Sequence, residues 1–373
     1  MKKRLAVIGG GVSGVTLARL VQGSFNVTIF ERESSLLQKL LRTGNGRANI
    51  YNRNIHSFAY NDEHFLSEHL PHIVKTLDDL FSAFNIVTYT DTEGRVYPYS
   101  RSAKALRALL IKDLKAEVKL EHNVEEIVKV RDKYKVDGEE FDAVALTMGS
   151  SAGLFKYPLD NGNAALLSAL DLETTALVPT IKTIKVKENL KRIEHERITA
   201  RVTLMDDENV IASDVGEVLF KKDGLSGIVS FILSSYLEWA VVRYPKRNYY
   251  LTLDLMPEFS ARYTAEIIKT TDDLDNVFSP NISHYLKGRN EPLLDRVKAL
   301  TFTPIPKNNP ENTSAMHGGI KLSKLNTDFE VRESPNLFAL GEVINIDGIC
   351  GGYNLAFAFY SAKVVSDALL RKL

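Results

Sequence analysis

Three glycines near the start of the chain have the spacing of a dinucleotide-binding turn. Gly9, Gly11 and Gly14 form the pattern G-x-G-x-x-G, directly after an apolar run over residues 5–8 and before a helical pattern that reaches about residue 21. In such a turn the first glycine permits a sharp bend, the second lets backbone N–H groups approach a pyrophosphate, and the third lets the helix pack closely against the strand. The positive end of the helix dipole then faces the phosphates.

An acidic residue ends the next expected strand, over residues 27–30. Glu31 can accept hydrogen bonds from ribose hydroxyls, and Arg32 follows it. A carboxylate at this position disfavours a 2′-phosphate, so the pattern predicts FAD or NAD rather than NADP. A glycine-rich turn without a ligand is the alternative, and the strand, helix and acid all in place argue against it.

Two further glycine-rich loops offer places for the rest of a cofactor. Residues 43–49 combine a fixed cation with two amides, which suits a pyrophosphate or the polar edge of a flavin ring, although an ordinary solvated turn fits equally well. The other loop lies between an expected strand over residues 337–340 and a helix over residues 355–370, where a helix dipole meets an anionic or carbonyl oxygen. A third strand, over residues 142–146, leads to a glycine that brings backbone beside the nucleotide. The predicted cofactor-binding residues in these segments are Asn45, Gly46, Arg47, Gly149, Gly341, Glu342, Gly351, Gly352, Tyr353 and Asn354.

Other polar clusters carry weaker signals. Tyr97 lies in an aromatic and polar loop over residues 93–100, which suits a substrate wall and equally suits a packed hairpin turn. His69 and His72 are three residues apart, but no Cys or carboxylate ligands cluster with them. We therefore predict surface histidines and no metal site.

The composition narrows the class of protein. The 373 residues are enough for two or three domains, and Lys plus Arg and Asp plus Glu each number 47, which favours neither nucleic acid nor an anionic membrane as a partner. Cys350 is the single cysteine, so disulfide reductase chemistry through a cysteine pair is excluded. Glycines end the first apolar run too early for a signal peptide, and no segment reaches the about 20 apolar residues of a membrane span. We expect a cytoplasmic protein of undetermined oligomeric state.

The elements that position these residues alternate between strand and helix patterns at both ends of the chain. From about residue 180, short alternating strands indicate an inserted β-rich region, and residues 257–300 are mostly helical and polar. The last sixty residues return to the strand, glycine loop and helix style of the first domain. The fold class predicted is α/β with a parallel sheet.

Several motifs together resemble those of a known family. GGGVSG, LLRTGNGRAN, GRVYPYS, DGLSGIVSFILSS and GEVINIDGICGGYNLAFAF look like the HI0933-like (YhiN) FAD-binding flavoproteins, which include BaiN-like and aminoacetone-oxidase-like proteins. The resemblance covers nearly the whole chain. It implies a Rossmann-like, glutathione-reductase-type FAD domain from residues 1–178 and 313–373, an inserted β-rich domain from residues 179–256 with 301–312, and a small helical domain over residues 257–300.

The resemblance also assigns parts of FAD to residues. The ADP half belongs to the first glycine turn and Glu31, and the backbone of Val124 contacts adenine. The 45–47 loop holds the pyrophosphate and flavin, and the C-terminal glycine loop lines the ribityl chain and the pyrimidine end of the ring.

Three departures from the family pattern matter. Ala48 stands where the family usually has Cys, so no cysteine acts there. Met316 and His317 precede two glycines where the family typically has Thr and Ala, which brings His317 near the flavin as a proton donor, with a partly exposed turn histidine as the alternative. The helical segment is also shorter than usual, which leaves substrate size open.

These features predict an FAD-dependent oxidoreductase that moves hydride between flavin N5 and a small or mid-sized organic substrate, with Tyr97, His317 or Tyr353 transferring the proton. No second G-x-G-x-x-G unit is present, so NAD(P)H as electron donor would dock transiently. A flavin-dependent RNA-modifying enzyme and an FAD-binding protein without turnover are the alternatives. Zero net charge argues against the RNA reading.

Overall fold

The computed structural model describes residues 2–150, 152–153, 163–207, 209–306 and 313–372. The chain divides into two compact units, Met1–Val178 with Ser314–Leu373, and Pro179–Thr313. The first unit is thus built from both ends of the chain and the second from one continuous segment. The finer division into three domains stays a prediction.

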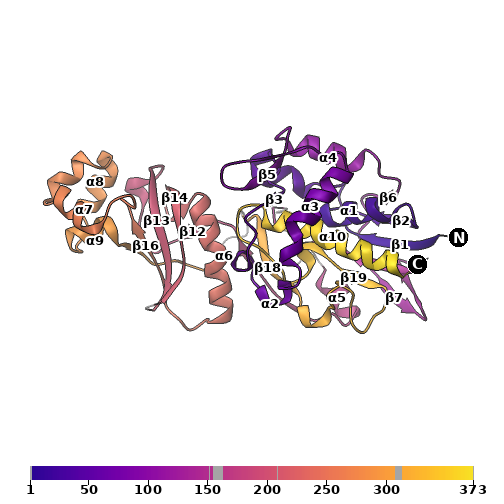
Figure 1. Cartoon of the computed structure of the whole chain (residues 1–373). Helices are drawn as coiled ribbons and strands as arrows, with labels where there is room; N and C mark the ends of the chain where they lie inside the picture. Colours follow the sequence, from indigo (N-terminus) through magenta and orange to yellow (C-terminus); the bar gives the residue numbers. More distant parts are fainter. Residues whose placement is uncertain (1, 151, 154–162, 208, 307–312, 373) are drawn as a thin grey trace. The chain divides into compact units, whose positions relative to one another are not determined.

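A five-stranded parallel sheet forms the centre of the first unit (Figure 1). Its inner strands are apolar over most of their length because helices and loops cover both faces. This sheet confirms the predicted α/β fold class. The strand order is β19 (Leu337–Ala339), β10 (Ala143–Leu146), β1 (Lys3–Ile8), β2 (Phe25–Phe30) and β6 (Glu117–Lys119).

The register of this sheet brings three loops to one edge. Ile8, the last residue of β1, is level with Phe30 of β2 and with Leu146 of β10. The residues that follow, Gly9, Glu31 and Thr147, therefore leave the sheet side by side. Because β1 connects to β2 on one side and borders β10 on the other, this edge is the switch point at which α/β sheets bind ligands.

Helices from both chain ends pack together on this sheet. Helix α1 (Val12–Val21) contacts α10 (Tyr353–Arg371), which in turn contacts α3 (Leu70–Ala83) (Figure 1). The remaining elements of the unit form smaller sheets and short helices. They are β3 (Tyr51–Asn52), β4 (Thr88–Thr90) and β5 (Arg95–Pro98); β7 (Ile127–Val130), β8 (Lys133–Val136) and β9 (Glu139–Phe141); β11 (Thr174–Thr180) with β18 (Ala315–Ile320); and the helices α2 (Glu63–Leu66), α4 (Ala103–Ile111) and α5 (Ala164–Ala169).

The second unit has its own core. Its six-stranded sheet packs against α6 (Ile228–Arg243), and a single cluster of buried apolar side chains runs through it from Ile184 to Phe302. The sheet order is β12 (Ile184–Lys185), β15 (Gly224–Ser226), β14 (Asn209–Lys221), β13 (Arg197–Asp206), β16 (Tyr249–Asp254) and β17 (Leu300–Phe302), and the short helices are α7 (Ala261–Ile267), α8 (Pro280–Lys287) and α9 (Leu293–Lys298).

Two local predictions differ from the structure. His69 is not a surface residue: its ring is buried, stacks on Phe329 and lies 3.1 Å from the Tyr360 hydroxyl through Nδ1. The helical pattern around residues 36–41 gives a 3-10 segment, Lys39–Gly46, with left-handed backbone at Gly44 and Asn45, because glycine and asparagine tolerate positive φ. Among the described residues, no helix is long and apolar enough to span a bilayer.

Candidate functional site

A pocket opens at the carboxyl edge of the parallel sheet, entirely within the first unit. Its empty volume, with the open mouth included, is about 1260 Å³. It is lined by the loops after β1, β2 and β10, by the start of the Lys39–Gly46 segment, and by Glu342 and α10. Of the predicted cofactor-binding residues, Gly9, Gly11, Glu31, Arg32, Val124, Gly149, Glu342 and Asn354 line it.

Glycine is needed at two positions of the first glycine turn, for two different reasons. A Cβ on Gly14 would lie 2.1 Å from the Gly9 carbonyl oxygen, so only glycine lets α1 start this close to β1. A Cβ on Gly11 would meet nothing within 4 Å and would enter the pocket. Gly11 caps α1 without a side-chain hydrogen bond, and the first turn holds no acidic residue. The free N–H groups of the helix start are therefore available to an anion.

Glu31 is held in place by the backbone around it. One carboxylate oxygen accepts the Gly10 N–H at 2.6 Å and the other accepts the Glu33 N–H at 2.8 Å. Burial raises the pKa of this carboxyl above its usual value, although the two N–H bonds oppose the shift. Each oxygen has a further lone pair, so the carboxylate can still accept from ribose hydroxyls.

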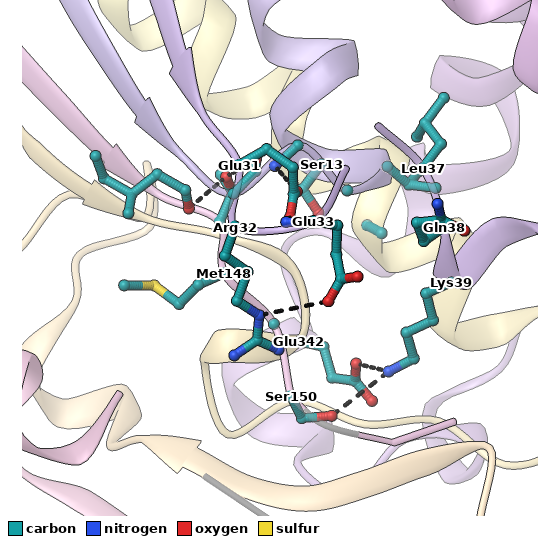
Figure 2. A pocket seen from close by; sticks show the side chains of 18 of the residues that line it. Ser13, Glu31, Arg32, Glu33, Leu37, Gln38, Lys39, Met148, Ser150 and Glu342 are labelled. Atoms are coloured by element: carbon teal, nitrogen blue, oxygen red, sulfur yellow. Dashed lines mark hydrogen bonds and ion pairs between the residues drawn. The ribbon is translucent and has the colours of Figure 1, made fainter. Parts of the chain in front are cut away.

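An ion pair faces the pocket on the side away from Glu31 (Figure 2). The Lys39 ammonium bonds the Glu342 carboxylate, and the Ser150 hydroxyl lies 3.4 Å from Lys39 Nζ. The other Glu342 oxygen accepts the Met316 N–H at 3.2 Å. The Lys39 ammonium thus compensates the negative charge of Glu342 at the pocket, so the carboxylate repels an anionic ligand less strongly.

Other predicted cofactor residues lie outside the lining of this pocket. Asn45, Gly46 and Arg47 are exposed. Gly341 has φ +73° and donates its N–H to Ser361 Oγ at 3.2 Å. The residues of the C-terminal loop that are not in the lining are Gly351, Gly352 and Tyr353, whereas the next residue, Asn354, is in it and bonds the Gly348 backbone through both ends of its amide.

The three proton-transfer candidates are not in the pocket lining either. Tyr97 lies on β5 and Tyr353 at the start of α10, and burial raises the pKa of both phenols. His317 is on β18 and is buried rather than a partly exposed turn residue. Its Nδ1 lies 2.8 Å from the buried Asp347 carboxylate, which fixes the orientation of the ring.

Several lining residues were missed from the sequence. Lys39 lines the pocket but lies inside a leucine-rich stretch of the sequence. Nothing in the residues next to it indicates that it contributes to a binding site. Thr147 and Ser150 lie two residues before and one residue after the predicted Gly149, so polar side chains after a buried strand were the available signal. The remaining ones include Ser13, Glu33, Gln38, His122, Asn123, Asn163 and Ser314. Among the described residues, no group of three or more His, Cys, Asp or Glu is placed to hold a metal ion.

Comparison with known proteins agrees with this geometry. The model of a family described as "HI0933-like protein Rossmann domain" matches residues 3–368. The chain belongs to this family. Its Rossmann-like fold is the one that the motifs predicted, and the match extends through both units.

Two curated relatives span the same length. The chain is 26% identical to a 3-dehydro-bile acid delta(4,6)-reductase of Clostridium scindens, covering 98% of each protein. It is 22% identical to a ribosomal RNA dihydrouridine synthase of Escherichia coli, covering 98% of this chain and 97% of the relative. Among solved structures, a 3-ketosteroid delta1-dehydrogenase from Sterolibacterium denitrificans has a TM-score of 0.51 at 10% identity, covering 98% of this chain and 100% of that one, which reflects the fold alone.

Proposed function

We propose that this family member is an FAD-dependent oxidoreductase acting on a small or mid-sized organic substrate. The observation that carries the proposal is the open space at Gly11, a residue of the pocket lining at which an added Cβ would meet nothing within 4 Å, beside the start of α1, which has no side-chain cap. This cradle fits the pyrophosphate of a dinucleotide. When bound, FAD supplies hydride exchange at flavin N5.

Different residues of the first unit are assigned to different parts of the dinucleotide. Gly9, Gly11 and Gly14 shape the pyrophosphate turn, Glu31 and Arg32 belong to the ribose, and Val124 to the adenine. The 45–47 loop belongs to the pyrophosphate and the flavin, and the backbone at Gly149 lies beside the nucleotide. Gly341, Glu342 and the 351–354 loop belong to the ribityl chain and the pyrimidine end of the flavin ring. Those of them that line the pocket support this assignment, and the others rest on the family resemblance.

Side chains of this protein would donate the proton that accompanies hydride transfer. Tyr97 and Tyr353 carry a phenol proton at neutral pH, as tyrosines ordinarily do, and burial raises their pKa values further. Each is therefore a candidate to donate a proton to a strongly basic substrate carbanion or enolate. His317 is oriented by Asp347, which suits a group that gives and regains a proton.

The name of the Clostridium scindens relative favours a reductase of a small organic molecule. The Escherichia coli relative favours a second candidate, reduction of a uridine in RNA, because its match also spans the whole chain. The electron donor, the cytoplasmic location and the three-domain division stay predictions.

Anaerobic reduction of the purified protein tests the proposal. We expect a yellow protein with a flavin spectrum that NADH, NADPH or an amine substrate bleaches. The reduced flavin should then be reoxidised by one acceptor from a panel of enones, oxygen and unmodified ribosomal RNA. Reoxidation by an enone supports the first candidate, and reoxidation by RNA supports the second. A colourless protein that does not bind added FAD would contradict both.

A further inference from the structure

A loop between β6 and β7 forms the side of the pocket that the proposed function assigns to adenine. His122, Asn123 and Val124 line the pocket there. The loop is tied to the end of β2 at one side: the Glu121 N–H donates to the Glu33 carbonyl at 3.1 Å and the His122 N–H to the Glu31 carbonyl at 3.0 Å.

The other side of the loop is tied by one carboxylate. Asp137, in the turn between β8 and β9, accepts the N–H groups of Glu125 at 3.1 Å and Glu126 at 2.9 Å through Oδ1. Its Oδ2 lies 2.8 Å from His122 Nε2. The Asp137 N–H in turn donates to the Glu126 carbonyl at 3.0 Å. Asp137 has φ +45°, a left-handed conformation that aspartate tolerates in a tight turn before glycine.

The middle of the loop differs from its two ends in its backbone hydrogen bonds. The N–H groups of residues 121, 122, 125 and 126 all have protein acceptors, whereas those of Asn123 and Val124 have none among the hydrogen bonds of the described residues. A backbone segment in a pocket lining, with its neighbours fixed and its own N–H groups without a protein acceptor, can read a base edge. A free N–H matches adenine N1, an acceptor, and a nearby carbonyl matches the adenine N6 amino group, a donor.

We propose that Asp137 is a positioning residue that sets the selectivity of this site for adenine. It acts through the loop and not by touching the nucleotide: its carboxylate fixes the two positions that flank Val124. The inference rests on the proposed function, since it takes the ligand to be an adenine dinucleotide. Hypoxanthine presents the opposite pattern, with a donor at N1 and an acceptor at O6, so a rigid loop should reject it and a loosened loop should not.

The test compares ADP with inosine diphosphate on the full-length apoprotein by calorimetry at fixed salt. Asp137→Gly removes the carboxylate without straining the left-handed backbone. Asp132→Gly, an exposed carboxylate in the neighbouring turn, is the matched control. We expect wild type and D132G to bind ADP more tightly than inosine diphosphate. In D137G the ADP affinity should fall about 10-fold, as expected when one or two hydrogen bonds between the loop backbone and adenine are weakened or lost. The inosine diphosphate affinity should change less than about 2-fold.

A purely structural role would lower both affinities together or lower the melting temperature of the apoprotein, leaving the ratio unchanged. An unchanged ratio in D137G therefore overturns the inference. If D137G does not fold, Asp137→Ala, which also removes both acceptor oxygens, decides: a lowered ratio supports the proposal, and a wild-type ratio contradicts it. If wild type binds neither ADP nor FAD, the proposed function fails, and the inference with it. If wild type binds FAD but does not prefer ADP to inosine diphosphate, the inference alone fails.

Discussion

At the scale of single residues, the pocket depends on the absence of one side chain. Gly11→Ala should weaken FAD binding at least about 10-fold, because the new Cβ enters the space in front of the α1 N-terminus. The melting temperature of the apoprotein should not fall, since the Cβ meets nothing within 4 Å and Gly11 has φ −75°. Gly23→Ala is the matched control, because a Cβ there also meets nothing within 4 Å but lies away from the pocket lining. Equal FAD affinity in the two variants would contradict the proposed site.

Lys39 compensates the charge of Glu342 in the same pocket. Lys39→Met should weaken FAD binding about 10-fold, because Glu342 then faces an anionic ligand without its cation. Fluorescence titration measures the affinity, and Lys104→Met, which removes an exposed lysine of α4, should leave it unchanged. The double variant with Glu342→Gln should recover part of the loss. A K39M effect that is the same with and without E342Q would mean that Lys39 acts on the ligand directly.

Glu31 gives the apoprotein a pH-dependent stability. Its folded pKa is raised above 4.5, so its charged form is less favourable in the folded than in the unfolded chain. This group's contribution to stability is therefore full at low pH and is lost as the pH rises through the folded pKa. The melting temperature of Glu31→Gln apoprotein, measured relative to wild type, should rise from pH 4.5 to 8. A difference independent of pH would show that the Glu31 carboxyl is not perturbed.

At the scale of elements, a buried ion pair joins the loop before β12 to α6. Lys182 Nζ lies 2.9 Å from Glu238 Oε1, with the two side chains 5% and 0% exposed. Lys182→Met should cost about 3–5 kcal/mol, because it leaves a carboxylate buried without its cation. Chemical denaturation measures this loss. Lys182→Met with Glu238→Leu should be markedly more stable than K182M alone. A K182M loss below about 1 kcal/mol would show that the Glu238 charge is compensated elsewhere.

At the scale of the whole molecule, the second unit is one continuous segment with its own apolar core. Residues 179–313 expressed alone should therefore fold, unfold cooperatively on heating and bind no FAD. Circular dichroism and a flavin titration measure these properties. A fragment that stays unfolded would show that this core needs the first unit to form.

The sequence by itself was enough to predict the glycine turn after β1 and the fold class. The strand, the three glycines, the helix and Glu31 are local in the chain, so their spacing was enough to predict the βαβ unit and its edge acid. The helical region over residues 257–300 was likewise predicted from local pattern, and α7, α8 and α9 occupy it.

Only the tertiary structure decided which distant residues share the pocket. Lys39 and Glu342 are separated by most of the chain, and the Asp137 carboxylate reaches its loop only because β7, β8 and β9 fold back on themselves. His69 looked like a surface residue because burial by Phe329 and Tyr360 comes from the far end of the sequence. Spacing along a chain predicts contacts within a turn or a βαβ unit, but contacts across a sheet edge depend on strand order and register. Here those are set by the packing of both chain ends around β1.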